Sequence, residues 1–181
     1  MRADEQGPAP AKLFSSVISG ATDLIEAVSG ELEKEFGLSD YSSPLMDFGY
    51  TDYYESEMGG ALKRRLLAFE RLVSPAELAG IKLFTNGVEG RYLTGDGRRK
   101  VNIDPGYLTL YNLIVASCKN YSHRVYLEKG VYAEVTLIFR DGEYRALDWT
   151  YPDYRGDMMR GVFREIRGRY AMELGRVKKG V

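Results

Sequence analysis

The segment spanning residues 123–149 constrains the fold of this 181-residue chain more than any other. It contains three extended runs, which are separated by Lys129-Gly130 and Asp141-Gly142. Both pairs suit two-residue hairpin loops, and Asp-Gly is among the strongest sequence signals for such a loop. The segment therefore predicts an antiparallel β-meander whose register is fixed by its two loops.

The predicted register places the single histidine of the chain next to an acid. With Lys129-Gly130 as the loop, Val125 faces Glu134, and His123 is a diagonal neighbour of Glu134 on the same face. The second loop puts Trp149 directly opposite Glu134. A carboxylate orients an imidazole and favours its charged form, which suits a general acid or an anion-binding imidazolium. We therefore predict that His123 and Glu134 are catalytic; the alternative is a strand histidine beside a surface acid.

The rest of the chain alternates between strand and helix patterns. The expected elements are a buried strand over 12–19, a helix over 21–37, strand character over 45–54, a strand over 61–73, a helix over 74–93, two extended pieces over 98–120 and an amphipathic helix over 156–174. The 61–73 segment also fits helical spacing, but Gly59-Gly60 would close a hairpin onto a strand. This order predicts an α+β fold with a ferredoxin-like β-α-β-β-α-β core, extended by an antiparallel β-meander and a C-terminal helix.

The charge distribution is uneven, although the formal net charge is only −1. Residues 1–60 carry 12 acids and 3 bases, whereas residues 155–181 carry 8 bases and 3 acids. The basic end either packs on the acidic half or remains available to bind an anion. No linker divides the chain, so we expect one α+β domain over 11–175, between a disordered tail over 1–10 and a basic tail over 176–181.

Several common kinds of site are excluded by what the sequence lacks. Cys118 is the only cysteine, so there is no intrachain disulfide, and one Cys with one His cannot form a four-ligand zinc site. The chain has no GxxxxGK[ST] loop, no GxGxxG and no GxSxG. It shows no signal peptide and no span long and apolar enough for a bilayer, so we expect a cytoplasmic protein without membrane contact.

Two further clusters of polar residues are candidates for a binding site. Asp52 and Glu57, together with Asp104, could supply oxygen ligands to Mg²⁺, although an acidic loop is the simpler reading. Asp104-Pro105-Gly106 predicts a type II turn, and Asn102 shares a strand face with Asp104. A third set, Lys82, Asn86 and Glu89, lies on one face of a predicted helix, which either faces solvent or lines a pocket.

Six motifs carry a resemblance to a known family: "YYESEMG", "KLFTN", "NIDPGYL", "KNYSHRVYL", "VYAEVTL" and "WTYPDYR". In this order they resemble a bacterial family catalogued as domain of unknown function 4416, over Lys12 to about Tyr170. Some members of that family carry the label GTP-binding protein, but this chain has no Walker loop and no NKxD-type guanine motif. The resemblance implies that polar residues of these motifs share one site: Glu57, Lys82, Asn86, Asn102, Asp104, Lys119, His123, Arg124, Glu134, Trp149 and Asp153.

These observations predict that the protein is an enzyme or a ligand-binding domain for a small phosphorylated or nucleotide-like anion, which it binds in a polar pocket on the sheet. Lys119, Arg124 and Lys82 would hold the anion, and His123 with Glu134 would transfer a proton. Glu57 and Asp104 would hold Mg²⁺, and the further ligand-binding residues would be Asn86, Asn102, Trp149 and Asp153. The alternative is a non-enzymatic adaptor that binds RNA or a protein through the Arg-rich C-terminal helix; the near-neutral charge makes nucleic acid the less favoured partner.

Overall fold

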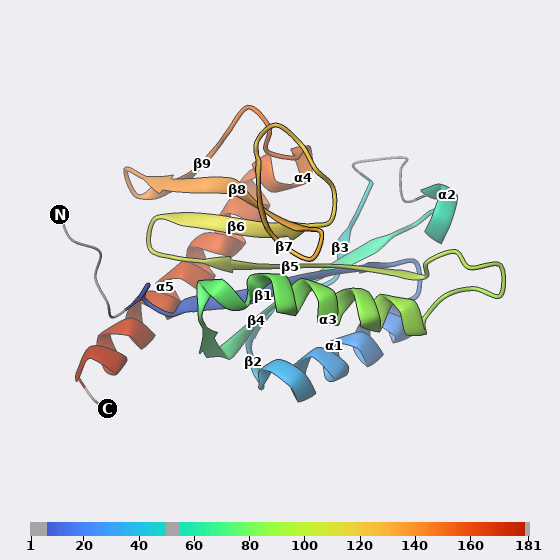
Figure 1. Cartoon of the computed structure of the whole chain (residues 1–181), viewed down its shortest axis with the longest axis horizontal. Coiled ribbons are helices and arrows are strands. Elements are labelled where there is room, and N and C mark those ends of the chain that lie inside the picture. Colours follow the sequence, from blue (N-terminus) through green and yellow to red (C-terminus); the bar gives the residue numbers. More distant parts are fainter. Residues whose placement is uncertain (1–6, 50–54, 180–181) are drawn as a thin grey trace.

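The computed structural model describes residues 7–49 and 55–179 and is built on one open antiparallel sheet of nine strands (Figure 1). The strands are β1 (Ala11–Ser19), β2 (Ser39–Ser42), β3 (Met46–Asp47), β4 (Lys63–Val73), β5 (Val101–Leu108), β6 (Asn112–Ser117), β7 (Arg124–Glu128), β8 (Val131–Arg140) and β9 (Glu143–Ala146). The helices are α1 (Thr22–Phe36), α2 (Glu55–Met58), the 3-10 turn η1 (Pro75–Glu77), α3 (Leu78–Arg91), α4 (Pro152–Arg155) and α5 (Asp157–Lys179).

The first half of the chain forms the predicted ferredoxin-like core. The elements β1, α1, β2, β4, α3 and β5 follow one another along the chain, and their strands lie in the order β2-β4-β1-β5 with antiparallel pairing. The strand reading of 61–73 is confirmed by β4. Its helix-like spacing arises because both faces of this strand are buried: Leu66 and Ala68 pack on one side of the sheet, and Leu67 and Phe69 on the other.

Helices cover both faces of this sheet. Helices α1 and α3 pack on one face, through a cluster that includes Leu13, Ile25 and Val88. Helix α5 packs on the other face, where Phe14 and Phe163 meet edge-on at 5.0 Å between ring centroids (Figure 1). The sheet is therefore buried on both sides over its central strands, and the basic helix α5 is one of its two covers.

Arginines of α5 hold this helix on the sheet through backbone carbonyls. Arg160 donates to the carbonyl of Tyr144, Arg167 to that of Leu110, and Arg169 to that of Asp40. The helix runs from Asp157 to Lys179 and so extends into the predicted basic tail. Three arginines of α5 are therefore used in packing, but only one of the carbonyls they bind, that of Asp40, lies in the acidic half, so the basic end does not pack on that half alone.

The turn predicted at Asp104-Pro105-Gly106 is wrong, because β5 runs straight through these residues. They pair with β1, with Pro105 opposite Ser15 and Gly106 opposite Phe14. Glycine is needed for close approach and not for a turn: a Cβ at Gly106 would lie 2.3 Å from the carbonyl oxygen of Ile114 and 2.5 Å from the Phe14 ring. Proline lacks the N–H that a sheet ladder uses, and the pairing of β5 with β6 begins directly after it.

Both predicted hairpin loops are present, but the register between them is not the predicted one. Lys129-Gly130 and Asp141-Gly142 all have positive φ, and Glu128 faces Val131 as expected. A β-bulge between Tyr126 and Glu128 then shifts the register, so that Arg124 and not Val125 faces Glu134. A β-bulge adds one residue to one strand, and the residues of the turn do not predict it.

The meander also differs in its pairing. Strand β6 pairs along one edge of β8, so β7 and β9 lie one after the other along the opposite edge. Strand β9 ends at Ala146, and Trp149 therefore lies outside the ladder and is not paired with Glu134.

Other observed elements differ from the predicted ones in their presence or their bounds. The strand β2 was not expected, and the strand expected over 45–54 is present only as Met46–Asp47. Residues 50–54, including Asp52, and residues 1–6 of the predicted tail lie outside the described residues. Among the helices of residues 7–49 and 55–179, none combines the length and apolar character needed to cross a membrane.

Candidate functional site

A cavity of about 640 Å³ lies where α3, β5, the end of β6, β7, β8 and the segment before α5 meet. Five basic side chains line it, and they come from five different parts of the chain: Arg64, Lys82, Arg99, Lys119 and Arg124. The acidic side chains in the lining are Glu89, Asp104, Glu134 and Asp153. Its volume falls within the range of roughly 300–1,000 Å³ that is usual for small-molecule sites.

The cavity exists because the sheet opens between β5 and β6. These strands pair only from Gly106 to Leu108, so the earlier part of β5 has no strand beside it on that edge. Side chains of α3 replace the missing ladder: Glu89 Oε1 accepts from the N–H of Ile103 at 2.6 Å, and Lys82 Nζ donates to its carbonyl at 2.8 Å. Lys82 and Glu89 therefore satisfy backbone groups that would otherwise be buried without partners.

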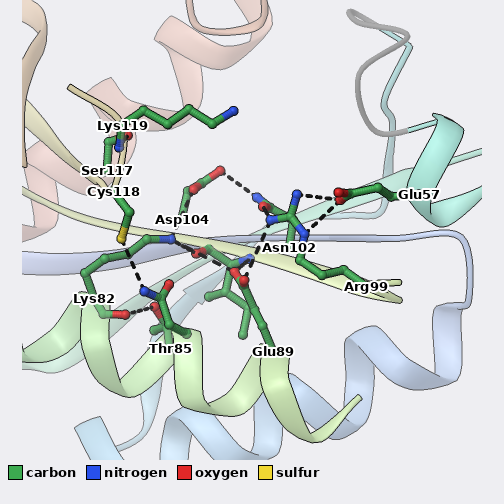
Figure 2. A network of polar contacts seen from close by, with 12 residues as sticks. Glu57, Lys82, Thr85, Glu89, Arg99, Asn102, Asp104, Ser117, Cys118 and Lys119 are labelled. Carbon is green, nitrogen blue, oxygen red and sulfur yellow. Dashed lines mark hydrogen bonds and ion pairs between the residues drawn. The ribbon is translucent and has the colours of Figure 1, made fainter. Parts of the chain in front are cut away.

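A polar network runs along β5 from this opening (Figure 2). Arg99 donates through Nε and Nη2 to Glu57 Oε2, at 2.8 and 2.6 Å, and through Nη1 to Asn102 Oδ1 at 3.0 Å. Asn102 Nδ2 donates to Asp104 Oδ2 at 2.7 Å, and Lys82 Nζ is 3.5 Å from Asp104 Oδ1. The predicted shared face of Asn102 and Asp104 is therefore observed.

The two carboxylates predicted to hold Mg²⁺ are both engaged by other side chains of this network. The Glu57 carboxylate is bound by the Arg99 guanidinium, and Asp104 is bound by an amide and approached by an ammonium. Within the part of the chain that the structure describes, no group of three or more His, Cys, Asp or Glu side chains is placed to hold a metal ion.

The wall on the other side of the cavity is organised around Glu134, which is only 3 % exposed. Its Oε2 accepts from Arg124 Nε at 2.8 Å and lies 3.1 Å from His123 Nε2. Arg124 also donates from Nη1 to Ser117 Oγ and to the carbonyl of Lys119, both at 2.9 Å. Arg124 therefore anchors the loop that carries Lys119 at the edge of the cavity.

His123 contacts Glu134 even though the predicted register is wrong. Because His123 precedes β7, strand alternation does not fix the direction of its side chain. Its ring stacks with that of Tyr121, at 5.8 Å between centroids, and with that of Trp149, at 5.4 Å and 10° between planes. The Trp149 indole donates to the carbonyl of Val135 at 2.8 Å, in the gap between β7 and β9. His123 and Trp149 therefore stand beside the cavity, in contact with its lining through Glu134.

The segment from Tyr151 to Tyr154 lines the cavity and is held at two points by arginines of different strands. Arg124 Nη2 lies 3.4 Å from Tyr151 Oη, and Arg64 Nη2 lies 2.5 Å from Asp153 Oδ2 in a buried ion pair. The Arg64 guanidinium also lies over the rings of Phe48 and Tyr154, at 4.5 and 5.4 Å from their centroids.

Sequence reasoning missed Arg64. In "KRRLLAF" nothing distinguishes it from Arg65, whose guanidinium pairs instead with Glu26 of α1. Strand alternation places the two arginines on opposite faces of the sheet. Which arginine lies on which face can be assigned only once α1 and α5 are known to pack on either side.

The electrostatics of the cavity are mixed, with a small excess of positive charge. Five bases face four acids, and burial raises the pKa of Glu89, an effect that neighbouring Lys82 and the N–H of Ile103 partly offset. The cavity thus offers both hydrogen-bond donors and acceptors, and it suits a ligand that carries an anionic group together with neutral polar groups.

Most of the predicted site residues are brought together by the fold. Eight of them line the cavity: Lys82, Asn86, Asn102, Asp104, Lys119, Arg124, Glu134 and Asp153. Asn86 does so from the same face of α3 as Lys82, with its amide 3.2 Å from Cys118 Sγ. The remaining three, Glu57, His123 and Trp149, contact that lining directly or through one neighbour. Their placement is observed, whereas their roles in binding and proton transfer stay predictions.

Comparison with known proteins adds one match. The family model described as "Domain of unknown function (DUF4416)" matches residues 9–170 of the chain. No curated protein and no solved structure matches it.

Proposed function

The chain belongs to the DUF4416 family, whose description assigns no activity, and from the cavity we propose that it binds a small phosphorylated or nucleotide-like anion. The observation that carries this proposal is the convergence of basic side chains from β4, α3, the loop after β6 and β7 on one cavity of ligand size. Anions of this kind are held by lysine and arginine donors in charge-assisted hydrogen bonds.

Lys119 is the side chain we assign to the anionic group. It follows β6 in a loop that Arg124 anchors through the Lys119 carbonyl and Ser117 Oγ. Figure 2 shows its side chain extended over the network formed by Asp104 and Asn102. Arg124 acts mainly as a positioning residue, because its nitrogens already contact Glu134, Ser117 and Tyr151.

We assign proton transfer to His123, with Glu134 as the group that orients it. Nε2 of the imidazole faces Glu134, and the ring stacks with those of Tyr121 and Trp149. Nδ1 is therefore the ring nitrogen that remains for proton exchange. A fixed ring with one oriented nitrogen is the arrangement that general acid–base catalysis requires.

The adaptor alternative receives less support from the structure. Arg155, Arg160, Arg167 and Arg169 all donate to backbone carbonyls within the chain, and Arg167 also lies over the Phe139 ring at 3.6 Å. These arginines would have to give up their contacts with backbone carbonyls before they could bind an RNA backbone.

Lys119→Ala is expected to weaken the binding of phosphorylated ligands by about 10–100-fold, the effect of losing one charge-assisted hydrogen bond of about 1.5–3 kcal/mol. The measurement is a thermal-shift titration with ribose 5-phosphate and nucleoside monophosphates, each compared with its unphosphorylated counterpart. At a concentration of about 100 Kd the wild-type chain should gain roughly 2.7 kcal/mol, or about 5–10 °C.

Lys34→Ala is the matched control, since Lys34 is an exposed lysine of α1 that does not line the cavity. It should leave the ligand-induced shift unchanged. The proposal is rejected if phosphorylated and unphosphorylated compounds shift the wild type equally, or if Lys119→Ala keeps the full shift.

A further inference from the structure

The aromatic side chains that line the cavity are of two kinds. Phe48 and Tyr154 are only 7 % and 6 % exposed, and the Arg64 guanidinium lies over both rings. Tyr121 and Tyr151 also line the cavity, but they are 57 % and 49 % exposed. These two tyrosines therefore lie at the mouth of the cavity, where a bound ligand can reach their rings.

Of the two exposed tyrosines, Tyr151 has the less occupied ring. The Tyr121 ring stacks with that of His123, and the Arg124 guanidinium lies over it at 5.1 Å from the centroid. Among residues 7–49 and 55–179, no other ring and no guanidinium packs on the ring of Tyr151 in this way. A half-exposed ring without a stacking partner is a surface on which another flat ring can bind.

The position of Tyr151 is fixed by its neighbours. Its backbone is extended, with φ −58° and ψ 145°, as expected for a residue before proline, and Pro152 then begins α4. Its Oη lies 3.4 Å from Arg124 Nη2, and Asp153 forms the buried ion pair with Arg64 two residues later. A ring held in this way loses little conformational entropy when a ligand stacks on it, so more of the stacking energy remains for affinity.

Tyr151 and Lys119 are close enough for one small ligand to contact both. The Arg124 guanidinium donates from Nη1 to the Lys119 carbonyl at 2.9 Å, and its Nη2 lies 3.4 Å from Tyr151 Oη. The Lys119 backbone and the Tyr151 hydroxyl are therefore separated by one arginine head group and its two contacts. Lysine has a flexible four-carbon stem, and Lys119 is exposed, so its ammonium can approach the phosphate of a ligand whose ring lies on Tyr151.

We propose that the ligand is a nucleoside phosphate, whose base stacks on Tyr151 while its phosphate is bound by Lys119. This inference rests on the proposed function and deepens it by naming the ligand class. In a nucleoside 5′-phosphate the base and the phosphate lie at the two ends of one ribose, which suits two contacts arranged around one arginine. Every base has a π-face, so stacking requires a base but does not select which one.

The test compares AMP with ribose 5-phosphate by isothermal titration calorimetry on the full chain. The two ligands share the sugar phosphate, and AMP carries a base where ribose 5-phosphate has a hydroxyl. The wild type is expected to bind AMP at least about fivefold more tightly, the effect of one base–aromatic stack. Tyr151→Leu should reduce this preference to less than about twofold, because the ring is removed, and leave the affinity for ribose 5-phosphate nearly unchanged.

Two further variants separate stacking from other effects of the substitution. Tyr151→Phe keeps the ring but removes the hydroxyl that contacts Arg124, and it should retain the preference for AMP. Tyr126→Leu is the matched control: Tyr126 of β7 is 57 % exposed, as Tyr121 is, but it does not line the cavity. It should also retain the preference.

Equal binding of AMP and ribose 5-phosphate by the wild type overturns the inference and leaves the proposed function standing. An unchanged preference in Tyr151→Leu, or its loss in Tyr151→Phe, overturns the inference as well, since the ring would then not be the group that recognises the base. If neither ligand binds, the inference and the proposed function both fail. The wild-type comparison decides the question even if a variant does not fold.

Discussion

Gly106→Ala is expected to lower the free energy of unfolding by about 3 kcal/mol or more, at the upper end of what overpacking costs. The new Cβ would lie 2.3 Å from the carbonyl oxygen of Ile114 and 2.5 Å from the Phe14 ring. The first neighbour is backbone of β6 and the second is a fully buried ring, so neither can move without disturbing the sheet. Urea denaturation followed by circular dichroism measures the loss.

Gly87→Ala provides the control for this substitution. Gly87 is exposed on α3, and an added Cβ there meets nothing within 4 Å. Alanine in a helix should stabilise the chain by up to about 1 kcal/mol relative to glycine. Equal effects of the two substitutions would mean that β5 and β6 do not approach each other as closely as described.

Lys12→Met is expected to lower the free energy of unfolding by about 3 kcal/mol or more at neutral pH, the usual cost of removing one partner from a buried ion pair. Lys12 is completely buried, with Nζ 2.5 Å from Asp40 Oδ2 and 2.6 Å from Glu173 Oε1. Without the ammonium, two carboxylates of β2 and α5 face each other with no cation between them. Urea denaturation at several pH values measures the effect.

The pH dependence of this variant follows from Glu173. Burial raises the pKa of Glu173 from its usual 4.5; Lys12 opposes this effect, and Asp40 adds to it. Because the folded state holds this proton more tightly than the unfolded chain, the contribution of Glu173 to stability is present below pH 4.5 and is lost as the pH rises through the folded-state pKa. The cost of Lys12→Met should therefore be smaller at pH 4 than at pH 7.

Lys63→Met is the matched control for burial. Lys63 of β4 approaches Asp47 at the same Nζ–Oδ distance of 2.5 Å, but this pair is exposed. Exposed pairs contribute about 0–1 kcal/mol. If Lys12→Met lowers the free energy of unfolding no more than Lys63→Met does, the stabilising role assigned to Lys12 between Asp40 and Glu173 is contradicted.

Features with a local cause could be predicted from the sequence. The loops at Lys129-Gly130 and Asp141-Gly142 depend on residues that tolerate positive φ, and both occur where expected. The capping box of Ser74 and Glu77, with Pro75 at the first position, likewise marks the start of the second long helical region. The order of such elements predicts a ferredoxin-like core, but its second strand is Ser39–Ser42 (β2) and not the segment predicted at 45–54.

Features that depend on the meeting of distant segments could not be predicted. The bulge beyond Tyr126 changes which residue faces Glu134, and no turn residue signals it. Pro105 and Gly106 form a turn signal by local rules, but they lie within a strand, where Gly106 allows the close approach of Phe14. The separation of β5 from β6, which opens the cavity, also depends on a distant segment. Lys82 of α3 binds the carbonyl of Ile103, where a neighbouring strand would otherwise pair with β5.

The anomalous difference map of a crystal soaked in tungstate, an analogue of phosphate, tests most directly whether the cavity binds an anion. We predict a peak inside the cavity, with an oxyanion atom within about 3 Å of Lys119 Nζ, and loss of this peak in Lys119→Ala crystals. Peaks confined to the outer surface, with none between β5 and β8, would contradict the assignment of this cavity as an anion-binding site.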